Sequence, residues 1–484
     1  MKPVVTGREL AFAPGIREQN RSKAALCAGW PRAEAARRTG GSTYSIAGVP
    51  CTQTAAIRPR PEATATLNPM RSVLFLLIVA GSASVCRGGT ETQQVAPTDP
   101  LTSPKVALVT FGPGGLPWER FGHNAIIVDD PAAGARIAYN YGVFDFQQKH
   151  FLLNLALGHM RYSLVAEPLE AAVERYTAEG RSVTVQMLNL APAQAGQLAS
   201  FLAWNVQPQH ADYQYDYFLN NCSTKVRDAL NQVLGGALER QLAHRPAPHT
   251  FRFDAVRLVS PDFWLALGMD AAMGPKGDRP LSLWQESFVP MVLSGAVGDV
   301  VVSGPNGATL PLVSDAEVVF PGKLLPAPSA PRELRLALLA VGIGLAALLV
   351  WLTGAKGRLY RACFAVLAGA WWLICGLSGL LLAGLWAFSD HWGIWENQNI
   401  LLLNPVCLFL PLVWWRAPRI ACHLATLVAA AALFSLIIRT LPGMYQDNLG
   451  FISLAAPVHM ALAALAWRQR PVASLAVHRD APLA

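Results

Sequence analysis

The chain has 484 residues, of which 52% are hydrophobic, and a formal net charge of +8. This length allows two or three domains, and the positive mean hydropathy argues against a wholly soluble protein. The basic residues gather toward both ends, whereas residues 101–332 carry slightly more acidic than basic side chains. The charge therefore gives no support for nucleic-acid binding, and nothing in the composition indicates an oligomeric state.

The first 86 residues are expected to lie outside the folded part of the protein. Residues 1–69 show no sustained periodicity, so we expect a disordered or untranslated extension. Residues 70–86, "MRSVLFLLIVAGSASVC", begin with Met70 and one basic residue and continue with about fifteen apolar or small ones. This pattern is typical of a secretory signal peptide, which makes Met70 the candidate start of the protein.

Residues 103–305 have the patterning of a mixed α+β domain. Apolar or alternating runs that end at Gly, Pro or Asp predict strands at "KVALVTFGPG", "HNAIIVDDP", "RIAYNYGVFDF" and "RSVTVQMLNL". Helical spacing predicts helices at "KHFLLNLALG", "EPLEAAVERYTAEG" and "APAQAGQLASFLAWNV". Residues 235–332 are Pro-rich, and their pattern predicts no order of elements.

Residues 334–467 predict a transmembrane domain of about five helices. The apolar runs lie near 334–354, 362–388, 400–415, 420–438 and 450–467, and the third is short and contains two prolines. Cations concentrate in the connectors "AKGRLYR" and "RAPR" and after the last run, and such basic connectors stay cytoplasmic. We therefore expect a multi-pass protein of the bacterial inner membrane, with residues 87–332 exported and a cytoplasmic C-terminus.

Within the exported segment, "YDYFLNNCSTKVRDAL" contains a cysteine at the start of an amphipathic helix. Cys222 is the only cysteine between residues 87 and 362, so a disulfide within this domain is excluded. Ser223 and Thr224 can satisfy first-turn amides. A thiol at a helix N-terminus is expected to have a lowered pKa, which favours a nucleophilic thiolate. The alternative is a structural cysteine buried in the core.

The motif "WERFGHNAIIV" supplies a histidine at the start of a strand. The turn at Gly122 would let the ring of His123 project from the end of the sheet, where it could act as the base for a cysteine nucleophile. The alternative is a strand-end histidine bonded to backbone. The other histidines fall on helical or loop-like segments without metal-ligand spacing, so no metal site is predicted: His150, His159, His210, His244 and His249.

Four ordered blocks resemble the exported domain of the Lnb-type lipoprotein N-acyltransferases. They are "ERFGHNAIIV", "IAYNYGVFDF", "EGRSVTVQMLNLAPAQ" and "YDYFLNNCSTKVRDAL", and together they span roughly residues 103–260. Weaker similarity continues in "GMDAAMGPKGDRPLSLWQESFVP" and "WENQNILLLNP". The order of the blocks is specific to the family and says much less about the substrate.

The resemblance implies a papain-like thiol fold in permuted order, related to NlpC-type peptidases and LRAT-type acyltransferases. Carried onto this chain, it makes Cys222 the nucleophile and His123 the base. Such folds place a third polar residue on the next strand to hold the imidazole. Asn140 is the best candidate for it, with Tyr139 and Tyr141 as rivals. The backbone amide of Cys222 could donate to an oxyanion.

The reaction implied by the resemblance is acyl transfer through a thioester at Cys222. The acyl donor would be a membrane lipid or lipoprotein, and the acceptor a lipoprotein amine; neither step needs a cofactor. Three other functions remain open on the residues alone: hydrolysis of a lipid ester, cleavage of a cell-wall amide, and a non-catalytic binding module attached to the membrane. Replacing Cys222 separates the last of these from the others.

Overall fold

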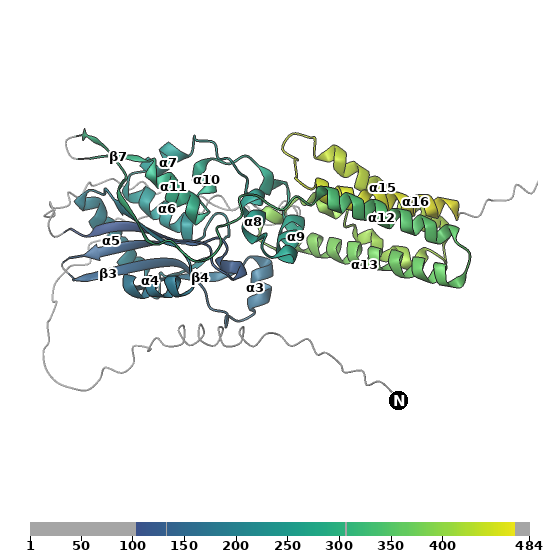
Figure 1. Ribbon diagram of the computed structural model, residues 1–484, viewed down its shortest axis with the longest axis horizontal. Helices are drawn as coiled ribbons and strands as arrows, with labels where there is room; N and C mark the ends of the chain where they lie inside the picture. The colour runs from purple at the N-terminus through teal and green to yellow at the C-terminus, as the bar shows by residue number, and fades with distance from the viewer. Residues whose placement is uncertain (1–102, 132, 305–306, 470–484) are drawn as a thin grey trace, which may run out of the picture. The chain divides into compact units, whose positions relative to one another are not determined.

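In the computed structural model, the described residues are 103–131, 133–304 and 307–469. They form a mixed α+β domain followed by a region of long apolar helices (Figure 1). The expectations for residues 1–69 and for the signal peptide at 70–86 therefore fall outside the described part of the chain. The α+β class and the apolar helical region are both confirmed.

A seven-stranded antiparallel sheet is the centre of the exported domain, with strand order β6-β4-β3-β2-β1-β5-β9. The central β1–β2 hairpin pairs Phe111 with His123, and β3 pairs with the other edge of β2. The strands are β1 (Lys105–Phe111), β2 (His123–Asp130), β3 (Ala135–Val143), β4 (Arg161–Pro168), β5 (Val183–Leu188), β6 (Asp212–Gln214) and β9 (Val313–Phe320). A separate two-stranded sheet pairs β7 (Val301–Ser303) with β8 (Thr309–Pro311).

Helices cover both faces of the large sheet (Figure 1). One face packs against α4 through a core that includes Val109, Ala125 and Ala172. The opposite face packs against α5, α6 and α11 through a larger core. The domain's helices are η1 (Pro117–Glu119), α3 (Phe151–Leu157), α4 (Leu169–Ala178), α5 (Pro192–Asn205), α6 (Cys222–Val233), α7 (Ala237–Leu242), α8 (Phe251–Val259), α9 (Phe263–Ala272), η2 (Pro275–Asp278), α10 (Leu283–Glu286) and α11 (Pro290–Gly298).

The elements expected from periodicity up to α6 are confirmed, but three strands of the large sheet and both strands of the small sheet were not predicted. Strand β6 is only three residues long, which is too short for an alternating pattern. Strand β4 does alternate, since Tyr162 and Leu164 are buried between more exposed neighbours, but charged and proline residues interrupt the pattern. Strand β9 is mostly exposed and pairs along one edge only.

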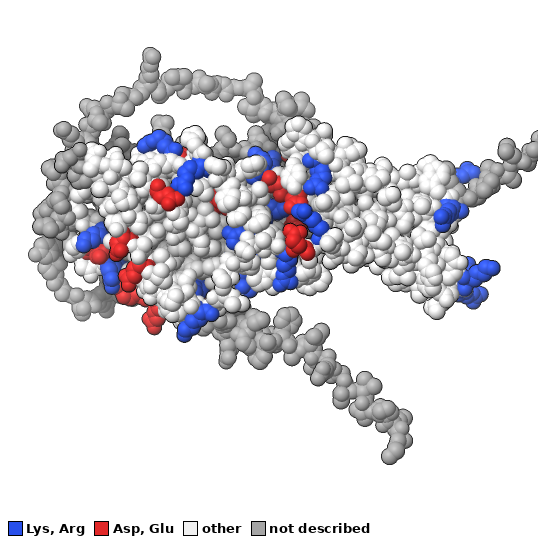
Figure 2. Space-filling model, turned by 45° about the horizontal axis from the view of Figure 1, so that its top comes forward, with Lys and Arg blue, Asp and Glu red and all other residues white. Residues whose placement is uncertain are grey.

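Four helices among the described residues are long and apolar enough to cross a membrane. They are α12 (Arg335–Gly354), α13 (Arg358–Phe388), α15 (Pro418–Ile438) and α16 (Leu449–Arg468). Each corresponds to one of the five apolar runs. On the face shown in Figure 2, no charged side chain appears along these helices, and Lys and Arg gather at one end of the helical region.

The third expected span, near 400–415, is not a continuous helix. It consists of η5 (Gln398–Leu401), η6 (Pro405–Phe409) and the one-turn α14 (Leu410–Val413). The side chain of Asn404 accepts a hydrogen bond from the backbone of Val406 and begins η6. Pro405 and Pro411 lack the amide hydrogens that a continuous helix needs, which explains the break. Five continuous membrane helices are therefore not confirmed.

Candidate functional site

The N-terminus of α6 is fixed by a complete capping box. The Asn221 side chain accepts a hydrogen bond from the backbone of Thr224 at 2.9 Å, and the Thr224 hydroxyl accepts one from the backbone of Asn221 at 2.8 Å. The Asn221 amide also donates to the carbonyls of Tyr217 and Phe288. The cap is thus Asn221, completed by Thr224, and Cys222 is the first helical residue.

A buried asparagine ties this helix to the sheet. Asn124 is fully buried and accepts a hydrogen bond from Thr110 of β1. Its amide nitrogen donates to the hydroxyl of Ser223 at 3.1 Å and to the carbonyl of Pro290 at 3.2 Å. The Ser223 hydroxyl in turn donates to the carbonyl of Ser287. Its side chain therefore does not cap the helix, although the sequence suggested that it could. Because every bond is buried, the network holds α6 in one position against β2.

Space for Cys222 comes from a glycine in an irregular part of β3. The pairing of β3 with β4 shifts between Asn140 and Val143, and Gly142 lies inside that shift with a φ of +88°. A Cβ atom on Gly142 would lie 3.3 Å from Cys222 Cβ and 3.6 Å from the ring of Tyr215. Gly142 therefore supplies both the left-handed backbone and the close approach of the helix.

His123 is held by a chain of polar side chains on β3, β4 and α4. Its Nε2 lies 3.1 Å from Asn140 Oδ1, and Asn140 Nδ2 donates to Glu167 at 2.9 Å. Glu167 is bound in turn by both terminal nitrogens of Arg175, each at 2.6 Å. Sequence reasoning singled out Asn140 but missed Glu167 and Arg175 in this role, since their partners come from distant elements.

These hydrogen-bonded side chains also fix the tautomer of His123. Asn140 Nδ2 is occupied by two acceptors, Glu167 and the carbonyl of Ala138, so its oxygen must face the ring. That oxygen can only accept a hydrogen bond, and Nε2 of His123 must therefore carry the hydrogen. Nδ1 is left with a free lone pair, which is the arrangement that a general base requires.

His123 and α6 lie on different faces of the sheet. The His123 ring lies 6.0 Å from the ring of Tyr176 on α4, whereas Asn124 faces α6. No described hydrogen bond joins the His123 ring to the Cys222 sulfur. The backbone N–H of Asn124, the next residue along β2, instead bonds to the Cys222 sulfur. Cys222 itself lies beside the bulge at Gly142.

The pKa values of the two groups differ from the sequence-based expectation. Burial raises the pKa of the Cys222 thiol and outweighs the opposing effects of the Asn124 backbone N–H and the charge of Arg181. Desolvation, aided by Arg181, lowers the pKa of His123 to about 3, although its bond to Asn140 opposes the shift. The expected lowered thiol pKa is therefore wrong. In the resting protein at neutral pH, both groups are uncharged.

The sequence did not reveal Arg181, a buried cation whose charge acts on both His123 and Cys222. Its Nε donates to the carbonyl of Gly112 at 2.8 Å, and its guanidinium lies 4.5 Å from the centre of the Tyr176 ring. Tyr176 stacks on Phe111, the residue paired with His123. The charge of Arg181 lowers the pKa of His123 and of Cys222 alike, so it disfavours imidazolium and favours thiolate.

The rival residues and the other histidines lie away from this arrangement. Tyr141 points to the opposite face from Asn140 and donates to Asn205 at 2.7 Å, and Tyr139 packs against the same core as Tyr141. Neither makes a described contact with His123. The remaining histidines, apart from His249, have other surroundings: His150 and His244 are exposed, His159 pairs with Asp390, and His210 stacks on Trp204.

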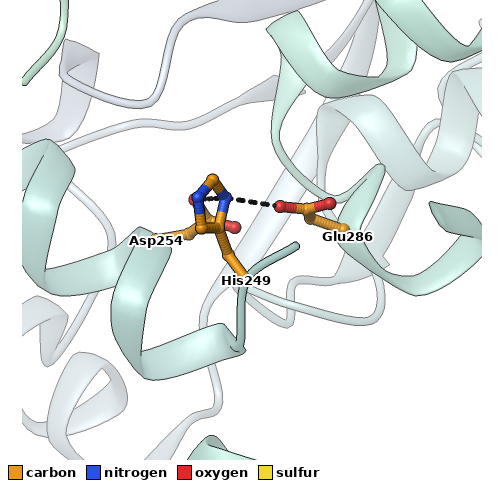
Figure 3. Close-up of side chains that lie close together, drawn as sticks. All are labelled: His249, Asp254 and Glu286. Atoms are coloured by element: carbon orange, nitrogen blue, oxygen red, sulfur yellow. Dashed lines mark hydrogen bonds and ion pairs between the residues drawn. The ribbon is translucent and has the colours of Figure 1, made fainter. Parts of the chain in front are cut away.

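His249, Asp254 and Glu286 form the one group of described residues whose donor atoms could together hold a metal ion (Figure 3). His249 Nδ1 lies 2.8 Å from Glu286 and 3.7 Å from Asp254, and Asp254 also accepts from Arg257. Burial raises the pKa of both carboxyl groups. Sequence spacing did not reveal this cluster. It ties α8 to α10, directly before the carbonyl of Ser287 that holds α6.

Comparison with known families separates the chain into two matched segments. The model of the Lnb N-terminal periplasmic domain matches residues 91–261, and the model of the Lnb transmembrane domain matches residues 334–470. The first match contains His123, Asn140 and Cys222. No curated protein and no solved structure matches the chain.

Proposed function

The chain belongs to the Lnb family, since both family domains match it in order, and from this premise we propose that it is a cysteine-dependent acyltransferase. It is a membrane protein with an exported N-terminal domain. We assign its substrates as membrane lipids and lipoproteins, with lipoprotein N-acylation as the reaction. The observations that carry the proposal are two: Cys222 begins a capped helix, and His123, held with Nδ1 free, precedes the residue of β2 that bonds to Ser223 of the same helix.

In the proposed first step, His123 Nδ1 removes the thiol proton while the sulfur attacks the carbonyl carbon of a lipid ester. The C–S bond forms, the ester C–O bond breaks, and the leaving alcohol takes the proton back from His123. Both groups are neutral at rest, so the thiol loses its proton only as the sulfur attacks, and no buried ion pair has to persist between turnovers.

In the second step, the amine of a lipoprotein attacks the thioester carbonyl. The C–N bond forms and the C–S bond breaks, and the proton lost by the amine returns to the thiolate through His123. The backbone N–H groups at the start of α6 can bind the oxyanion formed in both steps. Burial of Cys222 limits access of water, which favours aminolysis over hydrolysis.

We further propose that the fold is a permuted papain-like arrangement. The support is the chain order and the contacts: a histidine strand, an adjacent strand with the orienting amide, and then the cysteine helix packed at their end. Asn140 would keep His123 in its active tautomer, and Asn124 would keep α6 in register with β2. These two asparagines are positioning residues in the proposal.

For the membrane, we propose five crossings of the inner membrane and a cytoplasmic C-terminus. The broken segment follows α13 in the opposite direction: Gly379 contacts Leu403, Gly376 contacts Leu408, and Trp372 lies 4.9 Å from Trp414. A segment that runs along α13 in this way supplies the missing crossing without a continuous helix. Alkaline phosphatase fused after residue 331 should be active, and a fusion after residue 484 should be inactive. The reverse pattern would overturn this topology.

The reaction is tested with purified full-length protein and a diacyl lipoprotein as the only lipid. The proposal expects an N-acylated lyso product with an unchanged number of acyl chains, and none from Cys222→Ala. Free fatty acid as the sole product would indicate a hydrolase, and a released cell-wall fragment an amidase. If Cys222→Ala complemented a deletion strain fully, only a non-catalytic binding module would remain.

A further inference from the structure

One connector of the helical region contacts three separate segments of the exported domain. The connector follows α13 and spans residues 390–397, and each contact is a hydrogen bond to a different segment. The Asp390 backbone donates to Leu157 of α3 at 2.8 Å, Trp392 Nε1 donates to Asp216 at 3.1 Å, and Asn397 donates to Ala271 of α9 at 2.9 Å.

Each of these three segments exposes large apolar side chains. Leu152 on α3 is 77% exposed and Trp264 on α9 is 76% exposed. The full set is Leu152 and Leu153 on α3, Tyr217 and Leu219 in the loop before Cys222, and Phe263 and Trp264 on α9. Apolar side chains gathered on one side of a domain mark a surface that meets an apolar partner.

The position of the connector identifies that partner. It joins α13, whose final residue Phe388 is itself 66% exposed, to the segment that runs back along α13. A connector between two such segments lies at the surface of the bilayer on the exported side. The three segments bonded to it therefore lie near the depth where aromatic and leucine residues partition into a membrane.

Aromatic rings lead from α3 to the cysteine. The ring of Phe151 at the start of α3 lies 6.3 Å from Phe144, which lies 4.9 Å from Tyr162. Tyr162 stacks on Tyr215 at 3.9 Å. Tyr215 lies beside Gly142, as Cys222 does. These rings form a packed aromatic row between α3 and the start of α6.

We infer that α3, the loop before Cys222 and α9 insert into the outer layer of the bilayer, and that the lipid donor reaches Cys222 from this side of the domain. The insertion is independent of the proposed function, whereas the path of the donor lipid from the membrane to Cys222 rests on it.

Insertion is tested without catalysis, in the full-length Cys222→Ala protein in phospholipid vesicles. A photoreactive benzoylphenylalanine replaces Leu152, Trp264 or, as the control, Val318, which is 61% exposed on the edge strand β9. We expect phospholipid adducts at positions 152 and 264, and at least fivefold fewer at 318. Equal labelling at all three positions, or none at 152, would overturn the insertion.

The path is tested with Leu152→Glu combined with Leu153→Glu, against Val318→Glu. The double variant should lower transfer from vesicle lipid at least tenfold and leave alkylation of Cys222 by a small soluble reagent unchanged. Unchanged transfer would overturn the path. Lipid adducts at position 152 in a protein that transfers no acyl group would uphold the insertion and refute the proposed function.

Discussion

The exported domain and the helical region use buried polar side chains in different places. In the exported domain, buried Asn124 and Asn140 lie at the sheet end and hold the candidate site. In the helical region, a group of buried amides lies at the end that meets the exported domain, where Asn397, Gln446 and Asn448 take part in hydrogen bonds. Buried polar networks therefore hold the candidate site in one domain and the junction between the domains in the other. The outer surfaces of the long helices remain apolar, as contact with lipid requires.

The largest expected effect comes from removing the candidate base of the exported domain. His123→Ala should lower acyl transfer by about 100-fold or more, because a positioned general base contributes roughly that much. Steady-state transfer to a diacyl lipoprotein provides the measurement. His210→Ala, which changes a histidine stacked on Trp204, is the control and should keep near-native activity. Equal losses in both variants would remove His123 from the mechanism.

A glycine on α13 tests how the broken segment packs in the helical region. Gly379 contacts the backbone of Leu403 in the broken segment, whereas Gly384 on the same helix has open space around it. Gly379→Leu should reduce the protein accumulated in membranes by about tenfold, since overpacking a tight contact costs about 1–3 kcal/mol. Gly384→Leu should accumulate normally. Immunoblots of membrane fractions give the answer, and equal accumulation of both would contradict the packing of this segment.

The polar chain of the exported domain predicts a pH effect. The pKa of His123 is about 3, so the native imidazole stays neutral, and competent as a base, down to about pH 4. Asn140→Asp places a carboxylate against the ring and should raise the pKa of His123, so the ring charges as pH falls. Relative to pH 7, the variant should lose about fivefold more activity at pH 5 than the native protein. Matching pH profiles would show that Asn140 does not act on His123.

The smallest effect is expected from chelation. The donor atoms of His249, Asp254 and Glu286 could hold a metal ion, but Arg257 and the imidazole already bond to the two carboxyl groups, and the proposed chemistry uses only thiol and imidazole. Dialysis against EDTA should change acyl transfer by less than about twofold. The opposite result would be a large loss of acyl transfer that added zinc reverses in the native protein but not in Glu286→Gln. That result would make this cluster a functional metal site.

Local patterning was sufficient for much of the fold. Apolar or alternating runs predicted β1, β2, β3 and β5, and helical spacing predicted α3 through α6. Of these helices, α4, α5 and α6 bury one face against the sheet, whereas α3 buries no residue. The position of Asn140 on the strand after the histidine also followed from the family resemblance. The break near residues 400–415 coincides with Pro405 and Pro411, which are visible in the sequence.

What the sequence could not provide depends on distant contacts. Asn124 meets Ser223 across 99 positions, and Asn140 meets Glu167 across 27. The predicted direction of the Cys222 pKa shift was wrong for a related reason. A helix N-terminus is visible in the sequence, but the burial that outweighs it arises only when α6 packs against the sheet.

The central claim is that Cys222 carries an acyl group during turnover, and intact-protein mass spectrometry tests it most directly. Full-length protein incubated with diacyl phospholipid and no amine acceptor should gain the mass of one fatty acyl group. Neutral hydroxylamine should remove that mass, as it does from a thioester, and added lipoprotein should discharge it. Absence of the adduct from the native protein, or its persistence in Cys222→Ala, would contradict the account.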